Sequence, residues 1–223
     1  MRILLPPSEG KAEPERSAPV DLDSIAFAEE LGKNRRALIA VVGPKLRKAP
    51  AAPAAEIYTG VLFQRLDLEG LTAAARRRAA KRVLIASALW GFVRPEDRIP
   101  HYRLPPSTKL DGIGPLAAWW RPSLATAVPD EAGETIVDMR SGAYVSAWKP
   151  KRATLLSVRV FREEKGKRKA VSHMAKAVRG DVARALLSAR AEPKGPKEVA
   201  AVAADVGFEV ELTPKSLDVI VSD

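Results

Sequence analysis

Short apolar runs recur along the chain and predict buried strands. Ile3–Leu5 is followed at once by two prolines, and Val83–Ser87 (VLIAS) contains no charged residue. Continuous apolar runs of this kind are typical of strands that are covered on both faces. Further strands are expected at Thr135–Met139, Thr154–Arg162, Arg168–Ser172, Phe208–Leu212 and Leu217–Val221.

The segments between these runs have helical spacing, most clearly from His173 to Arg190. An apolar stripe with steps of three and four runs along this segment, formed by Met174, Val178, Val182, Ala185 and Ala189. Gly180 interrupts it, which costs about 1 kcal/mol relative to alanine. We therefore expect another chain segment or a ligand to approach the helix closely at Gly180. Other helices are expected at Leu22–Leu46, Leu71–Lys81 and Lys197–Asp205.

Strands and helices alternate without an internal repeat, and the chain has 223 residues of which 46% are hydrophobic. This is enough apolar material for one sizeable core. The sequence therefore predicts a single mixed α/β (α+β) domain spanning residues 1–223, a compact body in which helices flank a mixed sheet.

Irregular polar segments follow several predicted strands, and the longest is 88–104 (ALWGFVRPEDRIPHYRL). Its prolines restrict the backbone around Arg94, so the loop is expected to be rigid. Such segments, at the ends of core strands, are where α/β proteins usually carry function. Cations and polar groups recur at comparable positions, namely Ser8, Lys11, Arg94, Tyr102, Arg103, Tyr144, Lys149, Lys176 and Arg179.

If these residues converge, they form a cationic cleft, with Trp90, Tyr102 and Tyr144 as aromatic walls. Such a cleft suits a phosphate backbone with stacked bases. It suits equally a small anion in an enzyme pocket, where cations stabilise developing negative charge. The net charge of +10 and the pI near 10.0 do not decide between them, because a generally basic proteome explains both values as well as a polyanion partner does. The residues alone thus leave open whether the protein is an enzyme.

Composition and motifs exclude several other classes. The chain has no cysteine and two histidines, which excludes disulfides, thiolate chemistry, zinc-thiolate sites and a three-histidine metal site. No phosphate loop, G-x-S-x-G, H-E-x-x-H or dinucleotide motif is present. We expect no metal and no cofactor. No apolar run approaches the ~20 residues of a membrane span, and no signal peptide is recognisable, so we expect a cytoplasmic protein without a membrane partner.

The segment 110–120 (LDGIGPLAAWW) has two interpretations. Gly112-Ile113-Gly114 before a helix resembles the hairpin of a helix-hairpin-helix DNA-binding element, in which glycines let the backbone approach a phosphate. The other interpretation is a plain glycine turn before a helix, because Pro105 and Pro106 interrupt any preceding helix.

Taken together and in order, the motifs resemble those of the YaaA family of bacterial peroxide-stress proteins. The matching blocks are ILLPPSEGK at 3–11, IYTGV at 57–61, the segment 88–104, a tryptophan at 119 or 120, SGAYVSAWKP at 141–150 and SHMAKAVRG at 172–180. The opening turn departs from the family pattern at Pro6 and Glu9-Gly10, His101 replaces a more usual proline, and the chain is somewhat short. These departures concern the detail of the N-terminal site.

The resemblance implies a single α/β body with a helix-hairpin-helix element beside a positive cleft. It also implies binding of DNA, duplex or distorted, and protection against peroxide damage with lowered free iron. From it we expect a DNA-binding protein of the peroxide response, with a phosphate-binding role for Arg94, Arg103, Lys149, Lys176 and Arg179. The alternative is an enzyme that acts on a small anionic or nucleotide-like substrate in the same pocket. The oligomeric state is not predicted.

Overall fold

Five parallel strands form the centre of the fold in the computed structural model, which describes residues 1–15, 17–164, 167–171 and 173–221. Along the sheet their order is β3, β1, β8, β9, β12. Their bounds are Arg2–Leu5 for β1, Val83–Ser87 for β3, Thr135–Asp138 for β8, Thr154–Glu164 for β9 and Ser216–Val221 for β12. Three antiparallel strands complete the sheet: β4 (Gly91–Val93) beside β3, β10 (Lys167–Ala170) beside β9 and β11 (Glu209–Leu212) beside β12.

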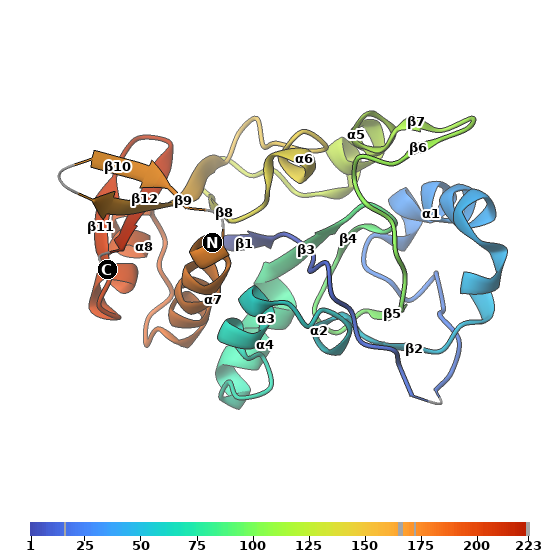
Figure 1. The fold of residues 1–223 in the computed structure, drawn as a ribbon, viewed down its shortest axis with the longest axis horizontal. Helices are drawn as coiled ribbons and strands as arrows, with labels where there is room; N and C mark the ends of the chain where they lie inside the picture. Colours follow the sequence, from blue (N-terminus) through green and yellow to red (C-terminus); the bar gives the residue numbers. More distant parts are fainter. Residues whose placement is uncertain (16, 165–166, 172, 222–223) are drawn as a thin grey trace.

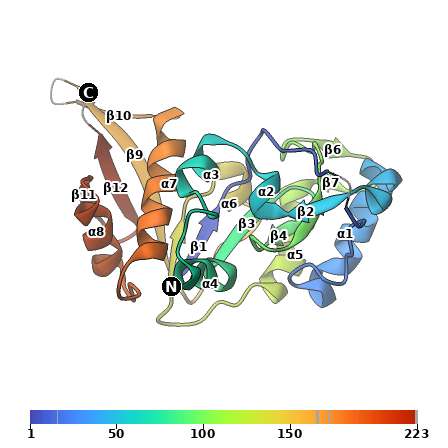
Figure 2. The same ribbon diagram turned by 90° about the horizontal axis from the view of Figure 1, so that it is seen from below.

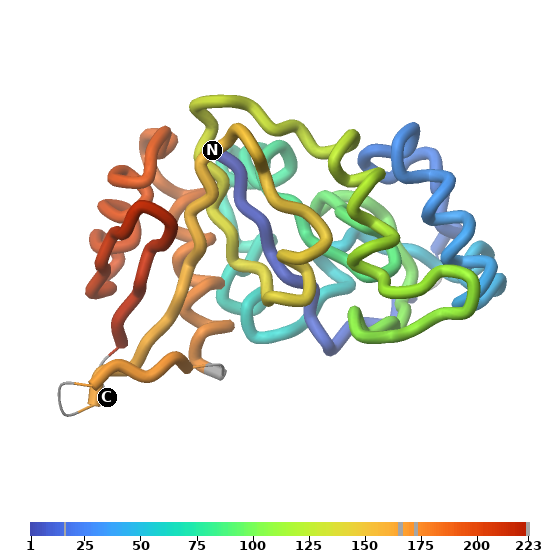
Figure 3. Tube along the Cα trace, turned by 90° about the horizontal axis from the view of Figure 1, so that it is seen from above, coloured from blue at the N-terminus to red at the C-terminus, as the bar shows by residue number. Residues whose placement is uncertain are grey.

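Helices cover both faces of the sheet, which explains why the central strands are continuous apolar runs. In Figure 1, α3 (Val61–Leu66), α4 (Ala73–Arg82) and α7 (His173–Ser188) lie below the sheet. On the opposite side lie α5 (Leu116–Ala127) and the single-turn α6 (Gly142–Val145). Figure 2 shows the lower layer in front of the strands, and Figure 3 shows the upper side. No helix within the described ranges is long and apolar enough to cross a membrane.

Two further helices lie at the two ends of the sheet. At one end, α1 (Ala28–Val42) packs against α5, and a short 3-10 turn at Pro44–Lys48 follows it. At the other end, α8 (Pro196–Asp205) packs against α7 and β11. A further single turn, α2 (Ala54–Ile57), precedes α3. Thus the predicted mixed α/β fold, with helices flanking a mixed sheet, is confirmed.

The close approach expected at Gly180 is confirmed, and the approaching segment is α3. A Cβ atom at Gly180 would lie 2.4 Å from the Leu62 carbonyl oxygen and 2.6 Å from the Arg65 Cβ atom. Both distances are shorter than atoms tolerate, so only glycine allows α7 to lie this close to α3. The packing fixes the position of α7, which carries Lys176 and Arg179.

The strand order reverses between β1 and β8. After β1 the chain forms β3 on one side, and it then returns past β1 to form β8 and β9 on the other side. In open α/β sheets ligands bind outside the carboxyl ends of the strands at such a reversal. A ligand site is therefore expected where the chain leaves β1 and β8.

Several elements within the irregular segments were not predicted. The segment 88–104 contains β4 and β5 (Arg98–Pro100), and β5 pairs with β2 (Ala51–Pro53) in a separate two-stranded sheet. The helix expected from Leu22 begins only at Ala28. Of the expected strand Arg168–Ser172, Ser172 lies outside the described residues.

The helix-hairpin-helix interpretation is not confirmed, and the structure shows a glycine turn before a helix instead. Residues 104–115 contain no helix; β6 (Lys109–Leu110) and β7 (Gly114–Pro115) pair as a small antiparallel hairpin directly before α5. Gly112 and Gly114 have φ values of +72° and +75°, so they serve this turn. The prolines at 105 and 106 prevent the first helix of such a motif.

Candidate functional site

Lys11 lies on the segment that leaves the carboxyl end of β1. An isolated bridge pairs it with Tyr58, and its ammonium nitrogen lies 4.7 Å from the Tyr102 ring centroid and 5.7 Å from that of Tyr58. The ammonium donates to the Ser8 carbonyl at 2.9 Å. The side chain is half-buried, and this burial lowers its pKa from the ordinary value. No carboxylate in the described part of the chain forms an ion pair with it.

Three hydroxyl groups form a buried chain beside Lys11. The Tyr58 and Tyr102 hydroxyls are 2.9 Å apart, and the Ser87 hydroxyl lies 2.8 Å from that of Tyr102. Ser87 also accepts the backbone N–H groups of Leu89 and Trp90, which fixes it at the end of β3. Burial raises the pKa of Tyr58 well above its usual value and that of Tyr102 to about 12. Both phenols are therefore neutral near pH 7 and do not balance the charge of Lys11.

Tyr144 enters from α6, just after β8. The pKa of its phenol is raised chiefly by burial and also by the charges of Tyr102 and Glu9. Tyr144 lines the same small cavity as Ser87. Arg140 holds α6 in place, because its guanidinium donates to the carbonyls of Tyr144 at 3.3 Å and Trp148 at 3.0 Å. The side chain of Arg140 is fully buried, and it forms two bonds of 2.8 and 2.9 Å to the Asp138 carboxylate.

The cations of α7 reach the same edge from the other side of β1. Lys176 lies 3.8 Å from the carboxylate of Glu9, and the side chain of Glu9 is 96% exposed. Arg179 donates to the Val158 carbonyl at 3.1 and 3.3 Å. Burial lowers the pKa of Arg179, and the nearby Asp138 carboxylate acts in the opposite direction. Lys176 and Arg179 thus approach the carboxyl ends of β1 and β8.

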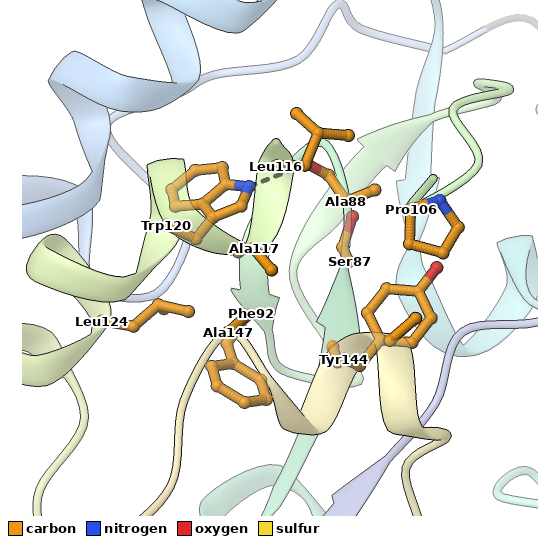
Figure 4. Close-up of a pocket in the computed structure, with 13 residues that line it drawn as sticks. Ser87, Ala88, Phe92, Pro106, Leu116, Ala117, Trp120, Leu124, Tyr144 and Ala147 are labelled. Carbon is orange, nitrogen blue, oxygen red and sulfur yellow. Dashed lines mark hydrogen bonds between the residues drawn. The ribbon is translucent and has the colours of Figure 1, made fainter. Parts of the chain in front are cut away.

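A small cavity of about 20 Å³ adjoins these groups. In Figure 4, Tyr144 and Pro106 lie on one side of it, and Trp120, whose indole N–H donates to the Ala88 carbonyl at 2.8 Å, lies on the other. The remaining lining is mostly apolar except for Ser87. The volume is enough for about one water molecule. This cavity is therefore packing space beside the polar cluster and cannot hold a nucleotide.

The predicted site residues fall into two groups. Contacts or electrostatic neighbours connect Ser8, Lys11, Tyr102, Tyr144 and Lys176, and Arg179 lies next to them at β8. Three others share no hydrogen bond, ion pair or ring contact with this group within the described residues. The Arg94 guanidinium lies 6.0 Å from the Phe27 ring, whereas Arg103 and Lys149 are exposed next to the buried Tyr102 and Trp148.

The predicted aromatic walls are wrong for two of the three rings. Trp90 is 0% exposed and Tyr102 is 4% exposed, so neither offers a free face to a base. Trp90 packs edge-to-face on Tyr102 with a centroid distance of 6.1 Å. Both rings belong to the core behind the site, as expected for large apolar groups next to a central strand. Only Tyr144, which is half-buried, remains at the surface.

Sequence reasoning missed Tyr58, Ser87 and the Asp138–Arg140 pair as parts of the site. Tyr58 lies in the IYTGV block, but its partners Lys11 and Tyr102 are far from it in the chain, and no spacing rule connects them. In the sequence, Ser87 was interpreted only as the last residue of a predicted strand. The one available signal was positional, because Ser87 and Asp138 are polar residues at the carboxyl ends of apolar runs.

Fold and site define a mixed α/β protein with a cationic polar cluster at the reversal of its strand order. Residues 28–212 match the family model described as peroxide stress protein YaaA. The chain is 42% identical over 260 residues to a UPF0246 protein of Streptomyces coelicolor, covering 100% of this chain and 99% of the relative. It is 37% identical over 239 residues to a UPF0246 protein of Corynebacterium efficiens, covering 95% of each.

This chain belongs to the peroxide stress protein YaaA family, as its motifs predicted. The family name supports a role in peroxide stress.

Proposed function

We propose that this protein binds DNA during peroxide stress and that it does so through the phosphate backbone. The observation that carries the proposal is the gathering of cations from distant parts of the chain at one sheet edge. Lys11 and Lys176 both neighbour Glu9, and Arg179 lies beside β8. Cations that converge on one edge, in a chain of net charge +10, are the electrostatic pattern expected of a phosphate-binding surface.

The exposed members of the predicted set offer the cleanest test. Arg103, Lys149 and Lys176 are exposed, so alanine at all three positions removes charge with little effect on folding. A matched control is available on α4, where Arg76, Arg77 and Lys81 are also exposed. Both triple variants lower the net charge by three, but the control removes its cations from a helix that ends at the opposite, amino edge of the sheet.

The measurement is fluorescence anisotropy with duplex, single-stranded and bubble DNA across a salt series. We expect wild-type binding to weaken steeply with salt, because bound cations release counterions from the DNA. Each lost phosphate contact reduces the slope by about one. The first triple variant should therefore lose up to about three units of slope, and the α4 variant should keep the wild-type slope. Equal slopes for the two variants would mean that DNA binding depends on the overall charge of the protein and not on the cations at this edge of the sheet.

A second candidate function is favoured by one specific observation. Lys11 is half-buried against two tyrosine rings, a position that a duplex backbone reaches less easily than a small ligand does. An enzyme that acts on a small anionic or nucleotide-like substrate would use such a group. Turnover would separate this candidate from DNA binding, since a protein that only binds leaves every nucleotide unchanged.

A further inference from the structure

Lys11 is a half-buried cation that forms no ion pair in the described part of the chain, and Glu9 acts on it only from beyond ion-pair distance. Its only acceptor in the described part of the chain is the Ser8 carbonyl, so two of its three N–H groups have no protein acceptor there. The two tyrosine rings stabilise the charge, but rings accept no strong hydrogen bond. Burial of an unpaired charge is unfavourable unless another group completes its surroundings.

The groups around Lys11 are also hydrogen-bond donors. Glu9 lies 3.8 Å from Lys176, and its charge acts on both Lys11 and Tyr144. Tyr144 lines the same small cavity as Ser87, whose hydroxyl bonds to Tyr102 next to Lys11. A distance of 3.8 Å is too long for a hydrogen bond. Because the side chain of Glu9 is 96% exposed, it can move into solvent at little cost.

We infer that Lys11, Tyr144 and Lys176 form a binding site for a phosphate monoester and that Glu9 occupies this site loosely when no phosphate is bound. The site lies where β1 and β8 end, at the reversal of strand order where ligands of open α/β sheets bind.

A phosphate monoester fits these groups better than a carboxylate does. It carries a charge of about −1.5 to −2 near pH 7 and has three strong acceptor oxygens. Two ammonium groups and one phenol match that charge and that number of acceptors. A carboxylate has a single charge, and Glu9 already supplies one. Arg179 adds a further positive charge nearby.

This inference goes beyond DNA binding, because a monoester is found on free mononucleotides and at the ends of DNA strands but not along a continuous backbone. The two sources share one chemistry, and binding experiments can distinguish them. The probes are AMP, adenosine, and one duplex with either phosphate or hydroxyl groups at its ends.

The test is calorimetric titration of the wild type and two single variants with these probes. We expect AMP to bind and adenosine not to bind. Lys11→Met should weaken AMP binding by about ten- to a hundredfold, the usual effect of losing a charged hydrogen bond. Glu9→Gln should instead strengthen it, by about two- to tenfold, because the competing carboxylate is gone. The matched control is Glu69→Gln, which removes the same charge from an exposed residue between α3 and α4 and should leave the affinity unchanged.

Failure of the inference differs from failure of the DNA proposal. Absence of AMP binding up to about 10 mM, together with duplex binding that ignores the end groups, would overturn the phosphate site and leave DNA binding intact. AMP affinity equal in the wild type and Lys11→Met would overturn it too. AMP binding that follows the predicted order of variants, without any duplex binding, would support the site and remove the DNA proposal. Tighter binding of the phosphate-ended duplex than of AMP would identify strand ends as the source.

Discussion

Arg140 and Lys11 lie on segments that follow two neighbouring strands at the same edge of the sheet. The surroundings of the two cations differ. Arg140, after β8, is fully buried, with two bonds to Asp138, two backbone carbonyl acceptors and the rings of Phe92 and Trp148 beside it. Lys11, after β1, is half-buried, with one carbonyl and two phenol rings. A cation whose donors are all used holds the fold together, whereas one with unused donors is available to a ligand.

The largest expected effect comes from replacing Arg140. Arg140→Met leaves the Asp138 carboxylate buried without its partner, which typically costs about 3–5 kcal/mol. Loss of the carbonyl bonds also frees α6 and therefore Tyr144. The free energy of unfolding from urea titration measures the effect.

Arg168 provides the control for this prediction. It makes a comparable two-bond pair with Glu211, at 2.6 and 2.7 Å, but both side chains are exposed. Arg168→Met should therefore change the free energy of unfolding far less than Arg140→Met does. If both substitutions cost the same, burial does not distinguish the two arginines and the comparison with Lys11 loses its basis.

The second effect concerns the tyrosines beside Lys11. Burial raises the pKa of Tyr102 from about 10 to about 12, so the folded protein resists ionisation that the unfolded chain undergoes. The stabilisation is therefore complete below about pH 10 and is lost progressively as the pH rises from about 10 to 12. The loss for Tyr102 alone is about 3 kcal/mol, from 1.36 kcal/mol per pKa unit.

Phenolate absorbance against pH checks this prediction. The chain has three tyrosines, and the pKa of each is raised. We expect no phenolate step near pH 10 in the folded protein and one cooperative step when the protein unfolds in alkali. A separate step near pH 10 would mean that at least one phenol is open to solvent.

The fold was largely predictable because its strands are buried on both faces. Val83–Ser87 was predicted with its observed bounds, and Ile3–Leu5 differs from β1 by one residue. The two-stranded pairs were not predicted, because β5 and β2 are short and contain proline, so their pairing depends on distant residues. Glycine spacing could not separate a helix-hairpin-helix element from the β6–β7 turn, since both use the same backbone freedom.

The sequence indicated which cations belong to the candidate site, but it did not predict how their side chains are arranged. Lys11, Lys176 and Arg179 follow or flank apolar runs, and the sheet order brings them to one edge. Whether each cation is paired depends on side chains far away in sequence, such as Tyr58 for Lys11 and Asp218 for Arg159. The prediction that Trp90 lines the cleft failed for the same reason, because the sequence does not show which face of a loop is covered by other residues.

A third, smaller effect tests how the α7 cations are positioned. In Gly180→Ala the new methyl group would lie 2.4 Å from the Leu62 carbonyl oxygen, so α7 must move away from α3. Such overpacking costs about 1–3 kcal/mol, and we expect AMP binding to weaken because Lys176 moves with the helix. Gly142→Ala is the control, since a Cβ atom there would have no atom within 4 Å and its helical turn favours alanine. Calorimetric unfolding of both variants gives the comparison, and equal stability would contradict a tight α3–α7 contact.

The smallest expected effect on stability is that of Lys11→Met, the same replacement that is severe at Arg140. Removing the ammonium loses one hydrogen bond to Ser8 and the attraction to two rings, each about 1 kcal/mol. It also removes the unfavourable burial of an unpaired charge, and replacing buried charges by apolar groups of similar size is often neutral. We therefore expect the free energy of unfolding to change by less than about 1 kcal/mol, while AMP affinity falls. A loss close to that of Arg140→Met would instead make Lys11 a second structural cation, and the proposed site would then lose one of its three donors.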